Sequence, residues 1–159
     1  MSMPLRLSGY LDARGARYEV RAHQPSRSSA ETARMAHILP HRLAKSVIVE
    51  DDSRCMMAVL PADRTVMLGH LARLLGRKDL RLSDENRIAM LFDDCDQGAV
   101  PPVGMAWGLE TIVDDALEAS DVVYLESGDH AHLLQMSHDQ FHALMSTAQH
   151  GHFCKAPLP

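Results

Sequence analysis

Apolar and polar positions in the first part of the chain change from helical to strand spacing and back. Apolar residues at roughly helical spacing predict a first helix within residues 5–15. Residues 18–23 alternate between apolar and polar side chains, which predicts a strand. Ser28 or Ser29 is a suitable N-cap for a helix through residues 30–39, which the following proline ends.

Two apolar runs come next, and a polar turn joins them. Residues 44–50 and 55–60 therefore predict a β-hairpin. A helix is expected over residues 69–75, and Ser83 is expected to cap another that runs to about Phe92.

The second half of the chain predicts short strands after a loop rich in glycine and proline at residues 98–104. A last helix is expected from residue 137 or 138 to about 147, followed by a frayed tail from residue 150. The strands expected in this half are residues 111–113, 122–126 and 132–136.

The order of the expected helices and strands predicts a mixed α/β or α+β fold, with a largely antiparallel sheet surrounded by helices. No internal repeat or linker interrupts the chain, so we expect one domain over residues 1–150 and a tail over residues 151–159. Neither GxGxxG nor GxxxxGK[ST] occurs, which disfavours a doubly wound nucleotide-binding fold.

The composition is that of a soluble globular protein, with 159 residues, 46% of them apolar and 23% charged. No apolar run is long enough for a membrane span, and the N-terminus does not resemble a signal peptide. The cysteines Cys55, Cys95 and Cys154 are odd in number and scattered, which fits a reducing compartment. We therefore expect a cytoplasmic protein without membrane association.

The net charge of −5 is unevenly distributed. Residues 1–88 carry 15 Lys and Arg against 10 Asp and Glu, whereas residues 89–159 carry 1 against 11. Arginine, which binds phosphate bidentately and stacks on bases, supplies 13 of the 16 cations. The basic half could contact RNA, although a merely solvated asymmetry explains the same counts.

Lys45 is the one lysine that opens an apolar strand. At the mouth of a sheet its ammonium would be partly desolvated and available to an ester carbonyl or a phosphate. A strand-end lysine that extends into solvent is the structural alternative.

The loop at residues 98–104 is the second candidate for chemistry. Pro101 and Pro102 fix the backbone, while Gly98 and Gly104 allow tight turns and close approach to a ligand. Such a loop can hold its remaining N–H groups rigidly toward an oxyanion or a hydroxyl, or it can be an ordinary rigid turn.

Two pairs of histidines have a spacing that could bind a metal ion. His130 and His132 alternate on a strand, and His138 and His142 are four apart on a helix. Neither pair has further ligands at a recognised spacing, so we expect neither a metal nor another cofactor. The GxSxG and HExxH signatures of serine hydrolases and zinc proteases do not occur.

Taken together, these features resemble the YbaK family of aminoacyl-tRNA editing domains associated with prolyl-tRNA synthetase. The resemblance rests on the strand that Lys45 begins, the Ser-Ser-Ala-Glu-Thr-Ala helix start before it, and the loop Gly-Ala-Val-Pro-Pro-Val-Gly at residues 98–104. The segment at residues 124–130 also looks like the C-terminal part of the family. The similarity covers roughly residues 5–147.

The resemblance implies a single YbaK-like domain that hydrolyses mischarged aminoacyl-tRNA in trans. Lys45 would match the lysine that contacts the substrate end of the tRNA and supports hydrolysis. Gly98, Pro101, Pro102 and Gly104 would belong to the loop that holds the aminoacyl end and terminal ribose. Ser46 stands where relatives often carry Thr or Asn, and two prolines stand where many have one, so the amino acid removed stays open.

The residues expected to bind the substrate surround this lysine and loop. They are Ser46, Val47, Ala99, Val100, Val103, His130 and, more weakly, His23. The densest basic stretch is expected to contact the tRNA through phosphates, which makes binding sensitive to salt. It comprises Arg73, Arg77, Lys78 and Arg81, and Arg21, Arg27, Arg34 and Arg42 flank the segment leading to Lys45.

The expected partners are the acceptor end of an aminoacyl-tRNA and an aminoacyl-tRNA synthetase. Two alternatives stay open: a module that binds tRNA or a synthetase without catalysis, and a hydrolase of small esters unrelated to tRNA.

Overall fold

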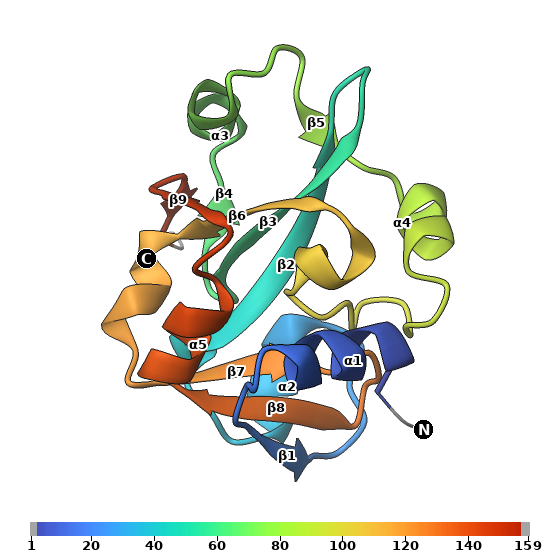
Figure 1. Cartoon of the computed structure of the whole chain (residues 1–159), viewed down its shortest axis with the longest axis vertical. Helices are drawn as coiled ribbons and strands as arrows, with labels where there is room; N and C mark the ends of the chain where they lie inside the picture. The colour runs from blue at the N-terminus through green and yellow to red at the C-terminus, as the bar shows by residue number, and fades with distance from the viewer. Residues whose placement is uncertain (1–2, 157–159) are drawn as a thin grey trace.

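A long hairpin forms the centre of the structure (Figure 1), a computed structural model that describes residues 3–156. It consists of β2 (Leu43–Glu50) and β3 (Cys55–Pro61), as the two apolar runs predict. The main sheet has the order β1-β8-β7-β2-β3-β6-β9, and β5 pairs with the end of β2. The other strands are β1 (Glu19–Ala22), β4 (Thr65–Val66), β5 (Arg81–Leu82), β6 (Glu110–Asp114), β7 (Val122–Glu126), β8 (His132–Ser137), β9 (Gln149–Gly151) and β10 (Cys154–Lys155).

The main sheet is mixed, as expected. The pairs β1–β8, β8–β7, β2–β3 and β2–β5 are antiparallel. The pairs β7–β2, β3–β6 and β6–β9 are parallel. Each parallel pair is joined by a crossover connection that contains helices or turns. The mixed sheet and the helices around it form one α+β domain.

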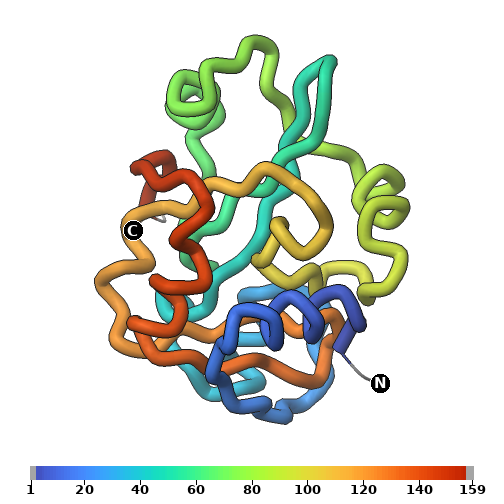
Figure 2. Tube along the Cα trace, in the orientation of Figure 1, coloured from blue at the N-terminus to red at the C-terminus, as the bar shows by residue number. Residues whose placement is uncertain are grey.

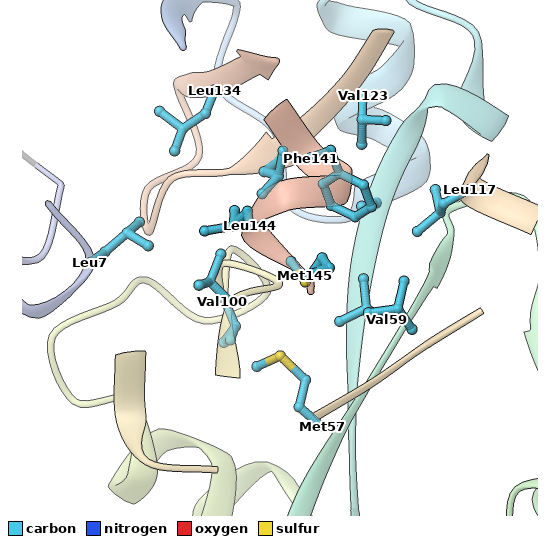
Figure 3. Close-up of a cluster of buried hydrophobic side chains, with 14 of the residues drawn as sticks. Leu7, Met57, Val59, Val100, Leu117, Val123, Leu134, Phe141, Leu144 and Met145 are labelled. Carbon is cyan, nitrogen blue, oxygen red and sulfur yellow. The ribbon is translucent and has the colours of Figure 1, made fainter. Parts of the chain in front are cut away.

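Apolar side chains cover both faces of the sheet, which is why β3 reads as an uninterrupted apolar run. Met57 and Val59 point into one cluster, which Figure 3 shows with Leu144 and Met145. Met56, Ala58 and Leu60 alternate with them and pack on the opposite face, against Leu71 and Phe153.

Five α-helices and three short 3₁₀ helices surround the sheet within residues 3–156. Of these, α1, α4 and α5 pack on the face of Met57, and α2 and α3 on the other. The helices are α1 (Leu5–Ala13), α2 (Ser29–Met35), α3 (Leu68–Leu75), α4 (Glu85–Leu91), α5 (His138–Leu144), η1 (Pro40–Arg42), η2 (Gly104–Trp107) and η3 (Asp115–Ala119). None of those helices has the length and apolarity that a membrane span requires.

Two helix starts test the predicted caps. Ser28 caps α2, because its hydroxyl accepts the Glu31 N–H at 3.2 Å. The prediction of Ser83 as the cap of α4 is wrong. The Ser83 N–H donates a hydrogen bond to the Ile48 carbonyl of β2 at 2.9 Å. Asp84 caps α4 instead, because its carboxylate accepts the Arg87 N–H.

The frayed C-terminal tail is also a wrong prediction for residues 150–156. The segment contributes to β9 and β10, and Phe153 is fully buried. The buried carboxylate of Asp114 accepts the backbone N–H groups of Phe153 and Cys154 at 2.8 and 2.9 Å. These bonds hold Phe153 and Cys154 against β6.

One edge of β2 is left open in the middle. At its start, Leu43 and Ala44 pair with Tyr124 and Leu125 of β7, and at its end it pairs with β5. Within residues 3–156, no strand pairs with residues 45–47 on this edge. Figure 2 shows how the chain passes from this hairpin through α3 and β5 to α4 and then, through residues 98–104, to the region beside α1.

Candidate functional site

A cavity of about 250 Å³ lies at the open edge of β2. Its walls come from the start of α2, the middle of β2, the β5–α4 junction, the loop at residues 98–104 and the end of β7. Ser46, Val47, Gly98 and Val100, all expected to contact substrate or support catalysis, line it. The structure thus brings together two sequence-distant segments that the sequence analysis selected.

Ser46 connects the strand to the loop. Its hydroxyl donates a hydrogen bond to the Val100 carbonyl at 3.2 Å. The Val100 side chain in turn points into the hydrophobic cluster (Figure 3). The loop is therefore held both by a polar contact at the cavity and by apolar packing behind it.

Lys45 adjoins the cavity without being among the residues that line it. Successive side chains of a strand point to opposite faces, so Lys45 shares the face of Val47 and not that of Ser46. It is half-buried, and burial lowers the pKa of its ammonium, while the Asp63 carboxylate opposes this shift. One Asp63 oxygen is itself buried and has no hydrogen-bond partner in the part of the chain that the structure describes.

Gly98 occupies a position that requires glycine. Its φ is 84°, and a Cβ there would lie 2.8 Å from the Arg27 carbonyl oxygen and 3.4 Å from the His130 ring. The absence of a side chain lets the loop approach the segment before α2 closely, and this closes one side of the cavity.

The other residues of the loop lie away from the cavity. Ala99, Pro101, Pro102, Val103 and Gly104 are all buried and do not line the cavity. Val103 belongs to the central cluster, and a Cβ at Gly104 would collide with the Thr111 hydroxyl and Met57. These residues fix the position of Gly98 and Val100.

His130 borders a second, more open hollow of about 530 Å³. This hollow shares Gly98 and Glu85 with the cavity, and Arg27 lines it as well. The His130 Nδ1 is buried, and none of the described residues forms a hydrogen bond with it. His23, at the end of β1, lines neither space; its Nδ1 bonds with the Gln24 carbonyl at 2.7 Å.

Glu126 lines the cavity and was not expected from the sequence. It is the last residue of β7 and only 2% exposed. A sequence signal was present, because a carboxylate ends the otherwise apolar strand Val-Val-Tyr-Leu-Glu. Glu126 lies beside the open edge because β7 pairs in parallel with β2. A local sequence pattern does not reveal this pairing.

The expected RNA-binding stretch is partly neutralised by acidic neighbours. Arg77 lies 3.4 Å from Asp51 and 3.6 Å from Glu110, and Arg81 lies 3.2 Å from both Glu50 and Asp52. Within residues 3–156, Arg73 and Lys78 make no ion pair and are exposed. These two are therefore the cations of the stretch that are free to contact a phosphate.

Among residues 3–156, one group of three side chains at the contact between η3 and α5 has ligand atoms close enough together to hold a metal ion. Ligand atoms of Glu118, His138 and His142 lie within 4.8 Å of one another. Glu118 is the third residue that the spacing of the two histidines does not reveal. None of the three lines the cavity described above.

Comparison with known proteins agrees with this architecture. A family model described as the aminoacyl-tRNA editing domain matches residues 23–144. A crystal structure of a hypothetical protein superposes with a TM-score of 0.83 at 24% identity, covering 94% of this chain and 99% of the other. A structure described as "a putative trans-editing enzyme for prolyl tRNA synthetase" superposes with a TM-score of 0.80 at 23% identity, covering 95% and 96%. A search of curated proteins finds no match.

The matched segment spans most of the chain and contains the cavity, the loop and Lys45. The chain therefore belongs to the aminoacyl-tRNA editing domain family, of the YbaK type that the sequence resembles. Membership supports a role in aminoacyl-tRNA editing in general and an interaction with aminoacyl-tRNA.

Proposed function

We propose that the protein hydrolyses mischarged aminoacyl-tRNA in trans and removes a small, non-cognate amino acid. The observation that carries this proposal is the cavity of about 250 Å³ at the open edge of β2, next to Lys45. Ligand pockets for drug-sized molecules measure roughly 300–1,000 Å³, so this one suits a smaller group such as one short aminoacyl chain.

A small cavity suits the selection that editing has to perform. A synthetase discriminates poorly between short apolar side chains, because one methylene contributes only about 1–3 kcal/mol to binding. A second site that admits only the smaller side chain removes the errors. The apolar surfaces of Val47 and Val100 supply such a wall, and the Ser46 hydroxyl supplies a polar one.

The chemistry requires little beyond positioning and charge, because an aminoacyl ester is already activated. In this proposal Lys45 supplies positive charge to the ester as negative charge develops on its carbonyl oxygen. The backbone N–H and C=O of Ser46, which point to the open edge because Lys45 and Val47 pair with β3, orient the aminoacyl end. Water is the attacking group, and a hydroxyl of the terminal ribose takes part in proton transfer.

The proposed partner is the acceptor end of a tRNA, with an aminoacyl-tRNA synthetase as a further partner in the cytoplasm. Arg27 is exposed and lines the hollow that continues from the cavity. We assign it to a phosphate of the acceptor end, beyond the aminoacyl group.

The test is deacylation of tRNAs charged with Ala, Cys, Ser or Thr by wild type and Lys45→Ala. Removing a well-placed charged donor should lower kcat by about 100- to 1000-fold. Lys155→Ala is the matched control, because this lysine is exposed on β10. An unchanged rate in Lys45→Ala would remove Lys45 from the mechanism.

The same assay separates the alternatives. Absence of turnover together with tRNA or synthetase binding would support the non-catalytic module. Equal turnover of the corresponding aminoacyl-adenosine and aminoacyl-tRNA would support a hydrolase of small esters.

A further inference from the structure

The carboxyl group of Glu126 is buried without a counter-charge among the described residues. The residue is 2% exposed, and both side-chain oxygens lack a hydrogen-bond partner within residues 3–156. Buried polar groups are almost always hydrogen-bonded, and a buried charge without a partner is costly. A group retained under these conditions at the wall of a cavity requires an explanation.

No neighbouring side chain within residues 3–156 supplies the positive charge that would pair with the Glu126 carboxylate. No described lysine or arginine forms an ion pair with Glu126. Burial raises the pKa of Glu126 to about 8; the Thr32 hydroxyl opposes this in part, and the Asp129 carboxylate adds to it. The Thr32 hydroxyl also pairs with that of Ser26 at 2.6 Å, and as a neutral group with one O–H it supplies no positive charge to the carboxyl.

The strand register places Glu126 next to the proposed reaction centre. Leu43 and Ala44 of β2 pair in parallel with Tyr124 and Leu125 of β7. One further step along both strands leads to Lys45 and Glu126, which therefore lie on the same face of the sheet. Glu126 lines the cavity, whereas Lys45 lies beside it, near Asp63.

The missing partner is a cation with several N–H donors that is small enough for this cavity. An aminoacyl ester carries such a group, the α-ammonium, one bond from the carbon that bears the ester carbonyl. We propose that Glu126 binds the α-ammonium group of the aminoacyl substrate; this assignment rests on the proposed function. The incoming cation would allow the carboxyl to ionise inside the cavity, and a charge-assisted hydrogen bond would form.

This assignment predicts which esters the site accepts. An ester with a free amino group completes the pairing of Glu126, whereas an uncharged α-substituent leaves a buried carboxyl without its cation. The site would then act on aminoacyl-tRNA and reject tRNA esters whose amino group is blocked, as in a peptidyl-tRNA.

The experiment compares alanyl-tRNA with lactyl-tRNA, in which a hydroxyl replaces the amino group at nearly the same size. Wild type should favour the alanyl ester by about 100-fold in kcat/KM, and Glu126→Gln should reduce this preference to about 5-fold or less. Glu85→Gln is the matched control, because Glu85 also lines the cavity but is exposed and accepts a bond from Gln97 at 3.2 Å. An unchanged preference in Glu126→Gln, or no preference in wild type, would overturn the assignment.

A binding measurement separates this inference from the proposed function. Calorimetry with 3′-alanylamido-3′-deoxyadenosine and its lactyl counterpart does not require turnover. Tighter binding of the alanyl compound, lost in Glu126→Gln, would support the ammonium site even if no tRNA ester were hydrolysed. Equal or undetectable binding of both compounds to wild type would overturn it, even if hydrolysis were observed.

Discussion

At the scale of single residues, the buried carboxyl of Glu126 makes the stability of the fold depend on pH. Its pKa rises from 4.5 to about 8 on folding, chiefly through burial. Between these values the unfolded chain has lost the proton and the folded chain retains it, so the free energy of unfolding falls as pH rises. Glu126→Gln removes this effect. Relative to wild type, the variant should gain on the order of 4 kcal/mol between pH 4.5 and pH 8.5.

Urea denaturation of both proteins at the two pH values measures this gain. Glu19→Gln serves as the control for the substitution itself, because Glu19 is exposed on β1 and does not line the cavity. A difference between Glu126→Gln and wild type that is constant across the two pH values would mean that the carboxyl ionises normally in the folded chain.

Glu126 also shows which kind of site residue the sequence alone does not identify. Lys45 and the loop at residues 98–104 are recognisable because their residue types are unusual for their local context. Glu126 ends an ordinary strand, and its burial follows from a parallel pairing with β2 some 80 residues earlier in the chain. Conversely, Val103 and Gly104 look like ligand-binding loop residues but are buried against β3 and β6.

At the scale of elements, local signals predict where α2 begins and why β2 and β3 form a hairpin. The elements that were missed depend on distant partners. β9 and β10 are only a few residues long and exist because they pair with β6 and β4. Ser83 and Asp84 are both good caps, and the choice between them follows from the bond of Ser83 to β2.

The contact between η3 and α5 provides an element-scale prediction. Glu118 bonds with His138 Nε2 at 2.6 Å and with His142 Nδ1 at 2.9 Å. Hydrogen bonds to Asp139 and Glu118 raise the pKa of His138. Burial acts to raise the pKa of Glu118, but hydrogen bonds from His142 and His138 outweigh it and lower the pKa.

These two shifts confine the stabilisation to a pH window. The histidine contribution is complete below about pH 6.5 and is lost as pH rises through the raised pKa of folded His138. The Glu118 contribution is complete above about pH 4.5 and is lost as pH falls through the lowered pKa. Glu118→Gln should therefore lower Tm most near pH 5.5 and much less at pH 9. A lowering of Tm that is independent of pH would show that the three side chains contribute packing only.

At the scale of the whole molecule, the distribution of charge determines where an RNA can approach. The chain carries a net charge of −5, and its cations lie mainly in the first 88 residues. Arg77 and Arg81 already neutralise acidic neighbours, so they have less charge to offer than the sequence count implies. Arg27 makes no ion pair within residues 3–156 and borders the hollow that continues from the cavity.

Arg27→Ala should therefore weaken tRNA binding more than Arg77→Ala does. Loss of one phosphate contact to a single-stranded acceptor end should reduce the slope of log K against log salt concentration by about 0.7. Filter binding of uncharged tRNA over a series of salt concentrations measures both the affinity and its salt dependence. Arg14→Ala is the control, because Arg14 is exposed and its guanidinium carbon lies 3.7 Å from the centre of the Tyr10 ring. If Arg77→Ala changed the slope and Arg27→Ala did not, the acceptor end would approach across α3 and β5, and its phosphates would have to displace Asp51 and Glu110 from Arg77.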